Sequence, residues 1–119
     1  MHVMQRGEIW WIELRDPIGS EPGGSRPVVI LQSERFNRSQ IDTVVVAVIT
    51  GNLRRARDPG NVLVFSSESG LPDDSVVNVS QILTVDKIVL RNRQGRLSSE
   101  KMKAVERGVA MVLQLKLAD

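Results

Sequence analysis

Short runs of apolar, β-branched residues dominate the first three quarters of the chain. Two runs, Pro27–Gln32 and Thr43–Ile49, are almost continuously apolar, which predicts strands that are covered on both faces. A long loop, Arg15–Ser25, precedes the first of these runs. Further strands are predicted at Glu8–Leu14, Asn61–Phe65, Ser75–Thr84 and Ile88–Leu90, with turn-forming residues at 58–61 and 70–74. The pattern therefore predicts a mainly β domain.

The C-terminal part of the chain has a helical pattern. Apolar residues recur there at spacings of three and four, at Met102, Val105, Val109, Val112 and Leu113. Ser98 or Ser99 can cap this helix, which is predicted to run to about Leu117. We expect the apolar stripe to be core or interface, and Gly108 to allow close packing. A short helix is also predicted near Ser33–Asn37. Five or six short strands with one packed helix predict a small, closed or nearly closed barrel.

The composition excludes several classes of protein. The chain of 119 residues suits one domain, 1–119, with residues 1–5 expected to be flexible. It has no cysteine and one histidine, His2, so a zinc, copper or iron site is not expected, and neither is any other cofactor. The sequence lacks both an apolar run of about 18 residues and a signal peptide, so we expect a cytoplasmic protein that does not enter a membrane.

The basic residues are mostly arginines, and they are clustered. The net charge is +2 and the pI is about 9.5. Clusters at residues 54–57 and 91–96 suggest a polyanionic partner, because guanidinium matches phosphate well, although a solvated surface is an equal alternative. With two Trp, two Phe and no Tyr, the chain is poorly suited to bind single strands by stacking alone.

The stretch GSEPGGSRPVVIL, residues 19–31, contains one acid, Glu21, and one arginine, Arg26, just before the start of a predicted strand. Glycines allow a backbone to approach a ligand closely, and Pro27 biases Arg26 to an extended conformation at the rim of the strand. The alternative is an ordinary loop whose arginine faces solvent. Thr50 ends another strand directly before Gly51, where its hydroxyl either faces a ligand or merely terminates the strand. The adjacent Asp73 and Asp74 are read as turn formers.

Four blocks of the sequence resemble one known family. RGEIWWIEL, DPIGSEPGGSRPVVIL, TVVVAVIT and DSVVNVSQILTVDKI follow one another in an order and spacing similar to the MazF/PemK toxins of type II toxin–antitoxin pairs. The resemblance runs from about Arg6 to Leu115. It implies a small SH3-like barrel with a C-terminal helix, assembled as a homodimer, a fold shared with the gyrase poison CcdB. It also implies a sequence-specific endoribonuclease that cuts single-stranded RNA, chiefly mRNA, without a metal, leaving 2′,3′-cyclic phosphate and 5′-hydroxyl ends.

The resemblance assigns roles to individual residues. The catalytic positions fall on Arg26, in the S-E-x-x-x-x-R-P block, on Thr50, in the V-x-x-I-T block, and on the loop acid Glu21. Substrate-binding positions fall on Ser20, Asn52, Arg54, Arg55, Asn78, Ser80 and Gln81. We expect the two arginines to bind phosphates and the last three residues to bind base edges. The alternative for Asn78 and Gln81 is that they are plain strand polars facing solvent. The implied partners are single-stranded mRNA and the C-terminal segment of a cognate antitoxin.

Two other functions stay open on the sequence. One is a non-enzymatic, CcdB-like poison that binds a target such as DNA gyrase, and the other is an SH3-like binding module without toxicity. The pair Arg26 and Thr50 favours the nuclease, because a pure binder has no need of it. A gyrase-type poison is expected to place its main contacts on the terminal helix, and the end of the chain, QLKLAD, shows no obvious device for this.

Overall fold

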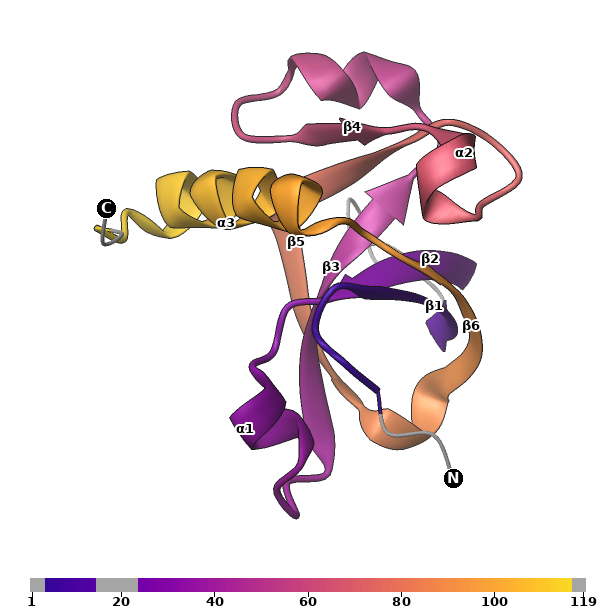
Figure 1. The fold of residues 1–119 in the computed structure, drawn as a ribbon, viewed down its shortest axis with the longest axis vertical. Coiled ribbons are helices and arrows are strands. Elements are labelled where there is room, and N and C mark those ends of the chain that lie inside the picture. The colour runs from indigo at the N-terminus through magenta and orange to yellow at the C-terminus, as the bar shows by residue number, and fades with distance from the viewer. Residues whose placement is uncertain (1–3, 15–23, 117–119) are drawn as a thin grey trace.

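The computed structural model describes residues 4–14 and 24–116 of the chain. Six antiparallel strands form one curled sheet in the order β4-β5-β3-β2-β1-β6. A C-terminal helix lies across the sheet near β5 (Figure 1). The strands are β1 (Glu8–Leu14), β2 (Gly24–Ile30), β3 (Thr43–Thr50), β4 (Val62–Val64), β5 (Ser75–Asp86) and β6 (Leu90–Arg96). The helices are α1 (Glu34–Asn37), α2 (Ser66–Ser69) and α3 (Ser99–Leu113), with 3-10 turns η1 (Leu53–Arg57) and η2 (Lys87–Val89). The mainly β fold with a terminal helix is confirmed.

The sheet has a hydrophobic core on each face. We call the core under α3 the helix-side core; it is built on Ile9, Val29, Ala47, Ile49, Val77 and Val79, with Met102 and Val105 from the helix. The second, which we call the barrel core, is built on Met4, Ile12, Val28, Ile30, Val44, Val46 and Val48. Residues of β5, η2 and β6 also pack against the barrel core, so the sheet curls around it. Because both faces of β2 and β3 are buried, these strands read as continuous apolar runs.

Helix α3 begins as predicted and ends earlier. The Ser98 hydroxyl caps it by accepting a hydrogen bond from the Lys101 backbone N–H at 3.1 Å. The helix ends at Leu113 rather than Leu117, because Gln114 adopts a left-handed conformation with φ of 57°. The first half of the apolar stripe is buried in the helix-side core, whereas Val112 and Leu113 are exposed.

Gly108 allows the close packing of α3 that the sequence suggested. A Cβ added to Gly108 collides with the backbone carbonyl of Gly60 and lies 2.9 Å from Val79 Cγ1. We therefore expect Gly108→Ala to lower the free energy of unfolding by about 1–3 kcal/mol, although alanine is the better helix former. Urea unfolding measures the change. The control is Gly51→Ala, where an added Cβ meets nothing within 4 Å. A Gly108→Ala protein as stable as its parent contradicts this packing.

Two predicted strands are corrected. The residues predicted as a strand at Ile88–Leu90 mostly form η2, and the sixth strand begins at Leu90 and runs to Arg96. Its sequence LRNRQGR has little apolar periodicity because it is a mostly exposed edge strand. Strand β2 begins at Gly24, inside the predicted loop, because Gly24 and Ser25 pair with β1.

Two short elements, η1 and α2, were not predicted. At the N-terminal end, Met4 is buried in the barrel core and the Gln5 N–H is bonded to Glu8, so these two residues of the predicted flexible end are packed.

Candidate functional site

The register of the central strands brings Arg26 and Thr50 together. Strands β2 and β3 pair from Ile30 opposite Val46 to Val28 opposite Val48, and Arg26 and Thr50 each lie two residues beyond the end of this pairing. Alternate residues of a strand share a face. Because Val28 and Val48 both belong to the barrel core, Arg26 and Thr50 lie on that same face of the sheet, at the end of the core.

The two side chains differ in exposure, and both are reachable from solvent. Arg26 is exposed and pairs through its backbone with Ile12 of β1. Thr50 is half-buried and pairs with Val76 of β5. Its Oγ1 accepts a hydrogen bond from the Asn52 backbone N–H at 3.2 Å, so the hydroxyl still has its own hydrogen to donate. The exposed guanidinium of Arg26 and the oriented hydroxyl of Thr50 therefore lie at the same end of the barrel core.

The turn after Thr50 is tied to it by hydrogen bonds. The Asn52 side chain accepts the Arg54 backbone N–H at 3.2 Å and so caps η1. This local bonding explains why the stretch GNLRRAR, which has no apolar periodicity, forms a defined 3-10 turn. Arg54 and Arg55 are both exposed, and Arg55 pairs with Asp58 at 3.4 Å. The structure thus places two predicted phosphate-binding residues on one turn beside Thr50.

An irregularity in β5 shapes the segment Asn78–Gln81. The pairing of β5 with β3 shifts between Ala47, opposite Ile82, and Val48, opposite Asn78, so residues 79–81 bulge out of that ladder. The Asn61 side chain stabilises the bulge by accepting the Val79 N–H at 2.9 Å.

The predicted base-reading residues in this segment differ in accessibility. The Ser80 hydroxyl donates to Asn78 Oδ1 at 2.9 Å, and Asn78 is buried with 9% of its surface exposed. Ser80 is exposed and Gln81 is half-buried. Asn78 lies opposite Val48, so it shares the face of Arg26 and Thr50. Ser80 carries the solvent-exposed polar group of the segment. The remaining site predictions, Ser20 and Glu21, lie outside the described residues.

Asp73 and Asp74 serve the turn, as the sequence indicated. Asp74 accepts the Ser66 backbone N–H at 2.8 Å and so supports the start of α2, and the Asp73 carbonyl accepts the Ser75 hydroxyl at 3.0 Å. Among residues 4–14 and 24–116, no group of three His, Cys, Asp or Glu side chains is placed to hold a metal ion. Within the same part of the chain, no helix is long and apolar enough to cross a membrane.

A buried carboxylate in β1 was not predicted from the sequence. Glu8 is fully buried, and its two oxygens contact the side chains of Trp10 and Arg93. An acidic residue at the start of an otherwise apolar strand was the available signal. Trp10 lies on the face of the barrel core, next to the row that contains Arg26 and Thr50.

A second acid, Glu34, stabilises the junction between α1 and the N-terminal segment. Partial burial acts to raise the pKa of Glu34, but hydrogen bonds from the Arg6 backbone N–H at 2.7 Å and the Asn37 amide at 3.0 Å outweigh it. The positive charges of Arg38 and Arg96 add to this, so the pKa of Glu34 lies below its ordinary value.

A pKa lowered by folding makes stability depend on pH in a defined direction. Ionised Glu34 stabilises the protein above the unfolded pKa of about 4.3, and this contribution is lost as the pH falls through the lower, folded pKa. Glu34→Gln keeps an acceptor oxygen and removes the charge. We expect it to be less stable than the parent at pH 7, with the difference shrinking below about pH 4. Denaturant unfolding between pH 7 and pH 3 measures this, and a difference independent of pH contradicts it.

Comparison with known proteins identifies the family. Residues 5–113 match the model of the PemK-like, MazF-like toxins of type II toxin–antitoxin systems. The endoribonuclease MazF6 of Mycobacterium tuberculosis is 44% identical over 113 residues, which cover 95% of this chain and 99% of the relative. The endoribonuclease MazF of Staphylococcus saprophyticus is 40% identical over 95% of this chain and 93% of its own length.

A solved structure confirms the fold. It is an endoribonuclease from a mycobacterial species in complex with its cognate antitoxin, and it superposes with a TM-score of 0.73 at 23% identity, covering 99% of this chain and 100% of that one. The likeness in sequence and fold spans nearly the whole chain. The chain therefore belongs to the family of PemK-like and MazF-like toxins of type II toxin–antitoxin systems, as an endoribonuclease of the MazF type.

Proposed function

We propose that this chain is a sequence-specific, metal-independent endoribonuclease that cuts single-stranded mRNA, and that it is the toxin that blocks translation and growth in a toxin–antitoxin pair. Cleavage would leave 2′,3′-cyclic phosphate and 5′-hydroxyl ends. The observation that carries the proposal is that Arg26 and Thr50 lie at neighbouring ends of β2 and β3, two residues beyond the last pair of these strands, Val28 and Val48, and on the face of the barrel core. Family membership supports the class of reaction, and the two side chains support its chemistry.

The reaction is an intramolecular transesterification at one phosphate of the RNA backbone. The 2′-oxygen attacks the neighbouring phosphorus, the bond from phosphorus to the 5′-oxygen breaks, the 2′-hydroxyl loses its proton and the leaving 5′-oxygen gains one. Negative charge accumulates on the phosphorane oxygens between these events. A guanidinium can donate to two of those oxygens at once, so Arg26 stabilises the transition state by charge and hydrogen bonding. Arginine is a poor acid or base, so this role is mainly electrostatic.

Thr50 supplies a hydrogen bond to the same phosphate. Its Oγ1 already accepts from the Asn52 N–H, which orients the hydroxyl so that its hydrogen can reach a phosphate oxygen. Glu21 is proposed either as the base for the 2′-hydroxyl or as the group that orients Arg26. No step of this scheme requires a metal ion.

The RNA on either side of the cut is proposed to lie along three segments. Arg54 and Arg55, exposed on η1, would bind phosphates beyond Thr50, with Asn52 beside them. Ser80 and Gln81 on the bulge of β5 would bind base edges, and nearly buried Asn78 would orient Ser80. Ser20 is proposed to contact the RNA from the loop that precedes β2.

The partners follow from the family and from one comparison. The antitoxin-bound mycobacterial structure supports a cognate antitoxin as partner. We propose that this antitoxin lays an acidic C-terminal segment over the basic surface that binds RNA. We propose a homodimer as well. The end of α3 leaves Met111, Val112, Leu113 and Leu115 exposed, which supports an interface at this place. Because its substrate is mRNA, the protein is proposed to act in the cytoplasm.

The proposal is tested by mapping cut ends. A long, unstructured RNA is incubated with the purified protein in EDTA, and the new 5′ ends are sequenced and tested for phosphorylation by kinase without prior phosphatase. Discrete cuts that share a short sequence and carry 5′-hydroxyl ends support the proposal. Intact RNA, from a protein that still arrests growth, contradicts it and favours a gyrase-type poison.

A further inference from the structure

Glu8 organises a small cluster at the start of β1. Its Oε1 accepts the Gln5 backbone N–H at 2.7 Å and the Trp10 indole N–H at 3.2 Å, and its Oε2 lies 3.1 Å from Arg93 Nη1. Glu8 is 0% exposed, whereas 51% of the Arg93 side chain is exposed. We call Glu8, Trp10 and Arg93 the Glu8 cluster. One carboxylate therefore fixes two side chains while remaining out of solvent itself.

The Glu8 cluster lies next to the candidate active site. Trp10 pairs with Val28 on β2 and with Arg93 on β6. Arg26 is two residues from Val28 on the same face, so Trp10 and Arg26 are diagonal neighbours, about 7–8 Å apart. Arg93 lies two strands from Arg26 and is offset from it by two residues, which places the two residues about 12 Å apart at the usual strand spacing and rise. The two guanidiniums are thus suited to different phosphates of one strand rather than to the same phosphate.

Burying a carboxylate to hold Arg93 costs desolvation free energy, so core packing alone does not explain why Glu8 occupies this position. A buried carboxylate is stable when it is paired and hydrogen-bonded, and an apolar side chain of similar volume is often at least as stabilising. The arrangement does remove rotamer freedom from an arginine on an edge strand before any ligand arrives. Of the five N–H groups of the guanidinium, one is bonded to Glu8 among the described residues, which leaves donors for a phosphate.

We propose that the Glu8 cluster forms a phosphate subsite for the nucleotide next to the cut, in which Arg93 binds the phosphate and Glu8 is the residue that positions Arg93. The inference rests on the proposed function and deepens it. Trp10 lies between Arg93 and Arg26 and keeps the two phosphate positions apart. This role concerns substrate binding rather than the chemical step.

The variant Glu8→Gln distinguishes a positioning role of Glu8 from a general effect of net charge, because the two predict opposite changes in RNA binding. The amide oxygen still accepts hydrogen bonds, but the charge that holds Arg93 is removed. If only net charge matters, loss of one negative charge strengthens RNA binding. If Glu8 positions Arg93, Glu8→Gln instead raises KM about three-fold with kcat little changed. Steady-state cleavage of a short RNA that carries the mapped cut sequence measures both constants.

The variant Arg93→Ala tests the phosphate contact itself. Its side chain is half-exposed, so the variant is expected to fold. We expect KM to rise about ten-fold with kcat within about two-fold, because one charge-assisted contact is lost. The slope of log affinity against log salt, measured on RNA with a 2′-deoxy nucleotide at the cut, should fall by about 0.7. The double variant Glu8→Gln/Arg93→Ala should resemble Arg93→Ala, because Glu8 acts through Arg93.

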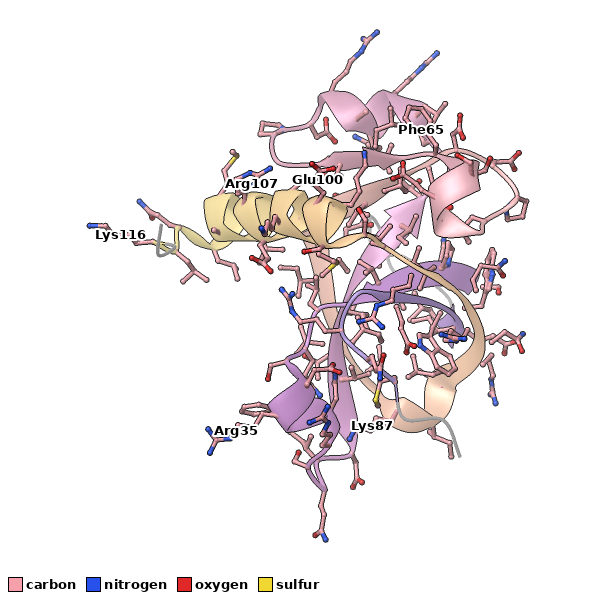
Figure 2. The ribbon with its side chains drawn as sticks, viewed as in Figure 1. Arg35, Phe65, Lys87, Glu100, Arg107 and Lys116 are labelled. Atoms are coloured by element: carbon pink, nitrogen blue, oxygen red, sulfur yellow. The ribbon has the colours of Figure 1, made fainter. Side chains whose placement is uncertain are left out.

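The matched control removes the same charge elsewhere. Arg35 is exposed on α1 and points away from the sheet (Figure 2), so Arg35→Ala should leave KM unchanged. A wild-type protein that cuts RNA, with KM unchanged in Arg93→Ala, overturns the subsite alone. A lower KM in Glu8→Gln, or effects of the two changes that add in the double variant, overturns the positioning role. A wild-type protein that cuts no RNA overturns the proposed function and the subsite with it.

Discussion

Replacing Arg26 with alanine is expected to lower the single-turnover rate of RNA cleavage by about a thousand-fold, because it removes the group that stabilises the phosphorane. Arg26 is exposed at the rim of β2, so the protein should remain folded. Arg26→Lys keeps the charge but loses the planar fork, and we expect it to recover a small part of the rate. The measurement is cleavage of the mapped RNA with enzyme in excess.

The control for this prediction is the loss of an equivalent charge far from the site. Arg107 is exposed on α3, and Figure 2 shows it on the side of the helix away from β1 and β2. Arg107→Ala should cleave RNA at the wild-type rate. Equal losses in both variants would indicate that only the general positive charge matters, and full activity of Arg26→Ala would remove Arg26 from the mechanism.

Replacing Thr50 with valine is expected to reduce the same rate by about 10–100-fold through the loss of one hydrogen bond to the charged phosphate. Valine has the same shape and suits a strand, so the core beneath it is preserved. The Asn52 N–H loses its acceptor, and we expect a loss of about 1 kcal/mol in the free energy of unfolding. Thr50→Ser, which keeps the hydroxyl, should stay within a few-fold of the wild-type rate. A Thr50→Val protein that is fully active rules out the proposed hydrogen bond.

The apolar strands were predictable because burial on both faces leaves a clear pattern. The bounds of β1, Glu8–Leu14, agree with the prediction, and β3 extends the predicted strand by Thr50 alone. The sixth strand was misplaced because an exposed edge strand needs no apolar residues, and LRNRQGR is held by backbone pairing to β1. The short elements η1 and α2 depend on hydrogen bonds that nearby backbone N–H groups donate to the side chains of Asn52 and Glu68, and such bonds carry no periodic signal.

The residues proposed for the site come from the sequence, whereas their arrangement in space could not be predicted from it. The sequence singled out Arg26 and Thr50, and family resemblance assigned their roles. Their apposition depends on the register of β2 against β3, and the accessibility of Asn78 and Ser80 depends on the bulge in β5. Neither the register nor the bulge can be predicted from local sequence, because both are set by pairing between distant segments. The role of Glu8 is not predictable from the sequence, because it depends on the contacts with Trp10 and Arg93, which only the fold brings together.

The central claim is that Arg26 and Thr50 act together on one phosphate without a metal. The most direct measurement is the single-turnover cleavage rate in EDTA for the wild type, Arg26→Ala, Thr50→Val and the double variant. Because both side chains stabilise the same charge, we predict that the double variant is little worse than Arg26→Ala, so that the two losses do not add. Losses that add fully would contradict joint action on one phosphate, and a wild-type rate that vanishes in EDTA and returns with a divalent cation would contradict the metal-free mechanism.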